Sequence, residues 1–187
     1  KNINFDSYQV IFIDNYSNDG SYEILKKNHN KKFTIIRNKK NYGQSYSLNK
    51  ALRLAKSPYI AIMDSDDICL KDRITQSYEF LKKNKEYALV AGRSNTINEK
   101  GKLIRVRKFT HNPDLINCRI FVDNPISHTT IMFKKQIIKK LGGYSRNLKF
   151  AQDFDLVSKL LLNKHKIKIL NKHFTLVRKH KNQQSFK

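Results

Sequence analysis

Short apolar runs and helix-like segments alternate through the first half of the sequence. The apolar runs, rich in β-branched residues, predict buried strands, and the segments between them predict helices. The predicted strands are residues 9–14, 33–37, 59–63 and 87–93, and the predicted helices are residues 21–28, 43–56 and 72–84. This alternation is typical of a mostly parallel sheet with helices on both faces.

The second half is less regular, although it contains the same kinds of element. The predicted strands are residues 103–109, 129–133, 167–170 and 175–178, and the predicted helices are residues 134–141 and 154–162. Gly142 and Gly143 end the first of these helices, as glycine often does. No linker or internal repeat divides the sequence, so we expect one α/β domain over residues 1–187.

Composition supports a globular domain. The chain has 187 residues, of which 39% are hydrophobic and 28% charged. No apolar run approaches the ~20 residues of a membrane-spanning helix, and the first ten residues lack the apolar core of a signal peptide. Cys69 and Cys118 form no Cys-x-x-Cys or Cys/His cluster, which argues against a disulfide framework and a structural zinc site. We therefore expect a reduced, cytoplasmic compartment.

The chain is strongly basic, with 38 Lys and Arg against 15 Asp and Glu and a formal net charge of +23. Such an excess suits a nucleic acid, an acidic lipid or another polyanion. The lysines are scattered in pairs, however, and no block of like charge or aromatic RNA-binding motif occurs. A lysine-rich background explains the charge equally well. We expect no specific nucleic-acid partner, and attachment to an acidic membrane surface stays open.

Acidic residues follow the predicted strands. In doubly wound sheets, ligands bind at the carboxyl ends of the strands, and Asp14 and Asp64 both lie there. Residues 64–67 read DSDD, and three carboxylates in four residues repel one another. A hard divalent cation such as Mg²⁺ or Mn²⁺ relieves that repulsion and often shares its site with phosphates. The alternative is a solvated acidic turn before the helix at 72–84.

Three further positions carry candidate chemistry. Asp153, at the start of a predicted helix, is either its N-cap or a general base. Arg178 and His180 either bind phosphate or belong to a basic tail. His128 is a lone loop histidine, and such residues are usually structural. The sequence contains no P-loop, GxGxxG, HExxH or GxSxG motif.

Taken in order, six segments between Val10 and Ser185 resemble the family 2 glycosyltransferases of the GT-A fold. A strand runs into a VDDGSTDGT-like segment, an N-x-G stretch leads to a later Asn, and a D-x-D motif follows a third strand. The N-P-I-x-H and G-G-Y segments, the (E)D-x-D-L segment and an R-x-H element complete the set. The matching residues are 13–21, Asn41 to Gly43 with Asn49, 61–67, 124–128 with Gly142 to Tyr144, 152–156, and Arg178, His180 and Ser185.

The resemblance implies transfer of a sugar, with inversion, from a nucleotide-diphosphate sugar, with a UDP-sugar favoured. The acceptor is expected to be a glycan or a lipid-linked glycan in surface polysaccharide synthesis. The nucleotide-binding half would cover about residues 1–93, and the acceptor-binding half with a C-terminal flap about residues 94–187. Mn²⁺ or Mg²⁺ would neutralise the leaving diphosphate.

The same resemblance assigns roles to individual residues. Asp153 would be the catalytic base, and Asp66 with His180 would bind the metal. His128 and Gln152 would face the acceptor. The residues expected to bind the donor are Asp14, Asn15, Ser17, Asn41, Gly43, Asn49, Asp64, Ser65, Arg178 and His180.

The sequence departs from the family pattern at three places. Asn15 stands where the second Asp of the first motif is expected, and Gln152 stands where a Glu is expected. The family's first strand and the helix after it have no counterpart, which would leave the sheet an exposed edge and the nucleotide pocket without a wall. The alternative function is therefore a non-catalytic protein, derived from a truncated transferase, that binds polyanions or membrane surfaces.

Overall fold

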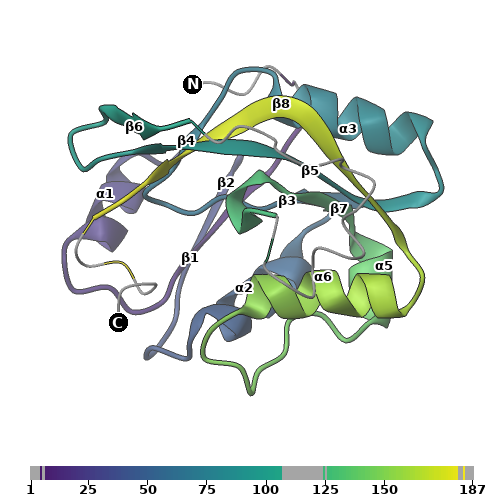
Figure 1. The fold of residues 1–187 in the computed structure, drawn as a ribbon. Coiled ribbons are helices and arrows are strands. Elements are labelled where there is room, and N and C mark those ends of the chain that lie inside the picture. The colour runs from purple at the N-terminus through teal and green to yellow at the C-terminus, as the bar shows by residue number, and fades with distance from the viewer. Residues whose placement is uncertain (1–4, 6, 107–123, 125, 181–182, 184–187) are drawn as a thin grey trace.

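The computed structural model describes residues 5, 7–106, 124, 126–180 and 183 (Figure 1). Cys118, Pro125, Ser185 and residues 107–109 of one predicted strand lie outside this range. The strands are β1 (Val10–Asp14), β2 (Phe33–Arg37), β3 (Tyr59–Ala61), β4 (Ile68–Cys69), β5 (Tyr87–Ile97), β6 (Leu103–Arg105), β7 (Met132–Lys134) and β8 (Lys166–Arg178). The helices are α1 (Ser21–Lys27), α2 (Gln44–Leu54), α3 (Arg73–Lys83), the short 3-10 helix η2 (His128–Thr130), α5 (Lys135–Lys140) and α6 (Gln152–Leu162).

The strands form two sheets rather than one. β1 and β2 pair in parallel, with Val10 opposite Phe33 and Asp14 opposite Arg37. The larger, six-stranded sheet has the order β3-β7-β5-β8-β4, with β6 added to β5. Within it, β5 and β8 are parallel and the other pairs are antiparallel. The α/β class is confirmed, but the larger sheet is mixed, because β7 and β8 from the second half insert beside β3 and β5. The alternation of strand and helix patterns in a sequence predicts which segments are strands, but it does not predict which strands pair with each other.

Helices cover both faces of the larger sheet, as Figure 1 shows for α3 on one side and α2, α5 and α6 on the other. Successive side chains of β5 point to opposite faces of the sheet, so they pack into two separate hydrophobic clusters. Leu89 and Ala91 face the larger cluster, which contains Leu156 and Leu160 of α6, whereas Val90 packs with Leu81 of α3. A strand segment buried on both faces reads as a continuous apolar run, as residues 88–91 of β5 do.

Several element boundaries differ from the sequence prediction. The two closing strands are one strand, β8, because residues 170–172 (Leu-Asn-Lys) bulge where the β5 register shifts from Ala91–Ile169 to Arg93–His173. Helix α1 is capped by the backbone of Gly20, and the Asp19 carboxylate accepts a hydrogen bond from the Ser21 N–H (3.0 Å). Over the described part of the chain, no helix is both long and apolar enough to cross a membrane.

Candidate active site

The acidic turn, residues 64–67, connects β3 to β4, and the segment after β8 packs against it. The Asp67 Oδ1 atom accepts a hydrogen bond from the Arg178 backbone N–H (2.9 Å). The Asp66 Oδ2 atom lies 3.1 Å from His180 Nε2. The structure thus brings together the two residues that the resemblance assigns to a metal. Ser65 lies exposed in the turn, between Asp64 and Asp66.

Arg178 anchors this C-terminal segment. Its Nε donates to the Asp66 carbonyl oxygen (3.0 Å), and its Nη1 donates to the carbonyl oxygens of Asn98 (3.1 Å) and Glu99 (2.8 Å) at the end of β5. A guanidinium with these partners holds three chain segments together. These contacts use Nε and Nη1, and the phosphate contact expected for Arg178 stays a prediction.

Negative charge accumulates around Asp64. Burial, together with the charges of Asp67, Asp66 and Asp153, raises the pKa of its carboxyl to about 6, while the charge of Arg73 opposes this shift. Burial also raises the pKa of Asp67. Several carboxylates therefore share one partly buried region, which is an arrangement that a cation would stabilise.

Arg73, the first residue of α3, lies directly beneath the acidic turn, and the sequence analysis missed it. Its side chain is buried, and Nη2 donates to the carbonyl oxygens of Ile62 (2.6 Å) and Ile131 (3.2 Å). Its Nη1 lies 3.2 Å from Met63 Sδ. The guanidinium thus joins the residues after β3 to those before β7 and places a positive charge under Asp64.

Asp153 lies in the first turn of α6, where the helix dipole favours a carboxylate. The N-cap of α6 is Ala151, in the left-handed conformation (φ 59°), and no side chain caps the helix. The interpretation of Asp153 as an N-cap is therefore wrong. Instead, Asn124 Nδ2 donates to Asp153 Oδ2 (2.8 Å), so the N-P-I-x-H segment orients this carboxylate.

His128 and Gln152 make internal contacts. His128 is buried, and its Nε2 lies 3.0 Å from the Tyr144 hydroxyl oxygen. Burial lowers the pKa of His128 to about 4, although Asp153 opposes this shift, so the imidazole is neutral near pH 7. Gln152 Nε2 donates to Gln44 Oε1 and connects the starts of α6 and α2. Both residues lie beside Asp153, and each of these contacts engages one side-chain nitrogen.

A second polar cluster lies at the carboxyl end of β1. The Asp14 carboxylate is buried, pairs with Arg37 (Nε to Oδ2, 3.1 Å) and accepts a hydrogen bond from the Ser17 N–H (3.1 Å). The next residue, Asn15, accepts hydrogen bonds at Oδ1 from Asn38 Nδ2 (3.0 Å) and the Tyr42 N–H (3.1 Å).

Asn15 also contacts the N-x-G segment, through the N–H donors of its side-chain amide. Its Nδ2 donates to Asn41 Oδ1 (2.7 Å), which also accepts from the Gly43 N–H (3.0 Å). Five of the predicted donor-binding residues are thereby gathered in one place.

Asn49 serves a different purpose. Its Nδ2 donates to the Tyr144 carbonyl oxygen (2.7 Å), and its Oδ1 accepts from the Tyr144 N–H (2.9 Å). Both ends of a buried amide are thus paired with the backbone of the G-G-Y turn. A Cβ at Gly143 would lie 2.4 Å from Asn49 Oδ1, so this glycine permits the close approach. The structure gives Asn49 a role in packing, and we do not retain the expectation that it binds the donor.

Comparison with known proteins identifies the family. Residues 1–142 match the family model described as glycosyl transferase family 2, which is most of the chain. The chain belongs to glycosyl transferase family 2. An uncharacterized glycosyltransferase of Methanocaldococcus jannaschii is 30% identical over 164 residues, covering 86% of this chain and 56% of the relative. The O-antigen biosynthesis glycosyltransferase WbnJ of Escherichia coli is 35% identical over 117 residues, covering 63% of this chain and 45% of the relative.

Solved structures confirm the GT-A fold of this family 2 member. The structure of S. aureus TarS 1–349 in complex with UDP-GlcNAc superimposes with a TM-score of 0.78 at 21% identity, covering 97% of this chain and 53% of that solved chain. The chain thus spans about half the length of the relatives and structures that it matches.

Proposed function

We propose that this protein transfers a sugar, with inversion, from a UDP-sugar to a glycan or lipid-linked acceptor in surface polysaccharide synthesis. The observation that carries the proposal is the acidic turn, in which Asp66 contacts His180 and Asp64 lies within electrostatic reach of Asp153. Named relatives support the substrate class. One is a UDP-Glc:alpha-D-GlcNAc-diphosphoundecaprenol β-1,3-glucosyltransferase from Escherichia coli, and TarS was solved with UDP-GlcNAc and with UDP.

The acidic turn suits Mn²⁺ or Mg²⁺ as a cofactor that completes its coordination with substrate. Within the described ranges, no three His, Cys, Asp or Glu side chains form a group that could hold a metal ion. Asp66 and His180 supply two donors, and these ions commonly take their remaining ligands from phosphate oxygens and water. The uncompensated carboxylates around Asp64 fit such a cation. When bound, the ion would neutralise charge on the leaving diphosphate.

The protein's own residues would bind the uridine and remove the proton from the acceptor. The cluster around Asp14 and Asn15 holds the uridine, with polar groups that the chain already positions by hydrogen bonds. The Asp153 carboxylate, oriented by Asn124, takes the proton from the acceptor hydroxyl. The resulting oxygen nucleophile attacks the anomeric carbon from the face opposite the diphosphate, and the configuration inverts.

A variant pair on α6 tests the base. In Asp153→Asn, we expect UDP affinity to persist while sugar transfer falls by about 10³-fold or more, because the proton acceptor is lost. Asp155→Asn is the matched control, since Asp155 lies on the same helix but pairs with Lys159 (2.8 Å). Normal turnover in Asp153→Asn would show that this carboxylate is not the base.

The metal requires a separate test. UDP binding measured by calorimetry should strengthen on addition of Mn²⁺ or Mg²⁺, and Asp66→Ala should abolish that increase. A chain that binds no UDP or UDP-sugar under any of these conditions would contradict the proposed transferase. Steeply salt-dependent binding to acidic vesicles in that case would favour the non-catalytic alternative.

A further inference from the structure

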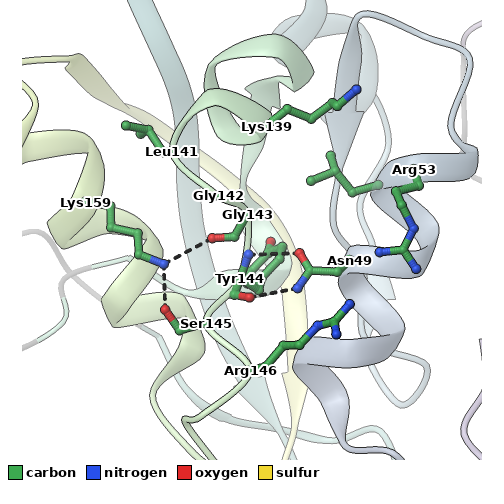
Figure 2. A pocket seen from close by; sticks show the side chains of 11 residues that line it. Asn49, Arg53, Lys139, Leu141, Gly142, Gly143, Tyr144, Ser145, Arg146 and Lys159 are labelled. Carbon is green, nitrogen blue, oxygen red and sulfur yellow. Dashed lines mark hydrogen bonds between the residues drawn. The ribbon is translucent and has the colours of Figure 1, made fainter.

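A pocket of about 360 Å³ lies between α2, the turn after α5 and α6 (Figure 2), and no residue of the acidic turn lines it. Its volume is within the range of small-ligand sites. The lining residues that matter below are Asn49, Arg53, Lys139, Tyr144, Arg146 and Lys159. Tyr144 apart, every ionisable side chain in the lining is a cation.

The inner wall of this pocket is held by polar contacts. Figure 2 shows Asn49 paired with the Tyr144 backbone, and Lys159 reaching the turn from the other side. Lys159 Nζ donates to Ser145 Oγ (2.6 Å) and the Gly143 carbonyl oxygen (3.2 Å), and it pairs with Asp155 Oδ2 (2.8 Å). Its three donors are therefore used, and the nearby Asp155 carboxylate is already neutralised.

Three other cations line the same pocket, namely Arg53, Lys139 and Arg146, and all three are exposed. In the part of the chain that the structure describes, none of them has an ion pair. Arg53 and Lys139 occupy the last turns of α2 and α5, where the helix dipole favours positive charge. Arg146 lies in a loop, with its guanidinium carbon 5.7 Å from the Tyr46 ring centre, so the dipole does not account for it.

We propose that this cationic pocket binds a phosphate group. Arginine binds phosphate oxygens through two parallel hydrogen bonds, and lysine adds a point charge. A phosphate dianion would neutralise most of the charge that the three side chains bring together. The phosphate is either free or an ester carried by the acceptor. Its assignment to the acceptor rests on the proposed function, whereas binding of phosphate does not.

Tyr144 connects the pocket to the candidate active site. Its backbone lines the pocket, and its hydroxyl group contacts His128 near Asp153. Asp153 and Lys159 are six residues apart on α6, or about 9 Å along the helix axis. An acceptor that places a phosphate in the pocket would therefore bind beside the same helix that carries the base.

Calorimetric titration of the full chain tests the pocket, with inorganic phosphate and glycerol 3-phosphate as probes and with or without saturating UDP. The double variant Arg53→Gln/Arg146→Gln should weaken phosphate binding by about tenfold or more, because charged hydrogen bonds are lost. Lys31→Gln/Lys83→Gln removes the same charge from exposed lysines elsewhere and should bind like the parent protein. The proposal would be overturned if Arg53→Gln/Arg146→Gln bound phosphate as tightly as the parent protein, or if UDP displaced the phosphate.

The two probes distinguish the sources of phosphate. Tighter binding of glycerol 3-phosphate supports an ester in the acceptor. Tighter binding of inorganic phosphate overturns the acceptor assignment. UDP affinity, measured in the same samples, reports on the proposed function independently, so the failure of either idea is visible without the other.

Discussion

Replacement of Arg73 by methionine should destabilise the protein strongly. Methionine fills similar apolar space, but it donates no hydrogen bond to the carbonyl oxygens of Ile62 and Ile131, which Arg73 Nη2 contacts at 2.6 and 3.2 Å. It also removes the positive charge beneath Asp64. Both carbonyls would lose a charged donor in a place where water has little access.

The magnitude follows from those two contacts. Hydrogen bonds to charged groups contribute about 1.5–3 kcal/mol each to stability. Removing one partner of a buried ion pair costs about 3–5 kcal/mol. We therefore expect Arg73→Met to lower the free energy of unfolding by about 3–5 kcal/mol. Arg73→Lys should cause a smaller loss, since it keeps the charge but has no planar fork to span both carbonyl oxygens.

Urea unfolding followed by far-UV circular dichroism measures these differences, provided that the denaturant dependence is the same for all variants. Arg105→Met, on the exposed strand β6, is the control and should change stability by less than about 0.5 kcal/mol. A loss below about 1 kcal/mol in Arg73→Met would refute the reasoning, because it would mean that losing the charged donor costs the two carbonyls little.

Two further predictions concern residues around the G-G-Y turn. The folded pKa of His128, about 4, lies below its ordinary value of 6.5, so its contribution to stability is complete above pH 6.5 and is lost as the pH falls toward 4. In urea unfolding from pH 7 to pH 4, His128→Gln should therefore lose less stability than the parent, by up to about 3 kcal/mol, and equal losses would contradict this. Asn49→Ala should lower stability by about 2 kcal/mol, because two buried hydrogen bonds to Tyr144 are lost, with UDP affinity in calorimetry unchanged. Loss of UDP affinity would instead restore Asn49 as a donor contact.

The sequence predicts those parts of the molecule whose structure follows from the type of residue at each position, without knowledge of its partners in the fold. The β5 segment is apolar enough to be recognised as a buried strand, and the strand leading into Asp64 marks the edge of the sheet where carboxylates collect. The contact between Asp66 and His180 was expected only from the order of motifs, since 114 residues separate them. Pairing was harder to predict, because β7 reaches β3 and β5 from the second half of the chain.

Arg73, which sequence reasoning missed, and Asn49, which it assigned to the donor site, share a physical property: both bind backbone atoms of distant segments. Arg73 contacts a carbonyl oxygen 58 positions away, and Asn49 contacts both backbone polar groups of a residue 95 positions away. Every residue has a carbonyl group, so such a contact requires no complementary side chain, and the partner leaves no trace in the sequence. Motifs reveal the groups that would meet substrate, whereas the groups that hold those motifs in place emerge only from the folded chain. Because the acidic turn is fixed from below by one such residue, substitutions at Arg73 should affect the site as strongly as substitutions within it.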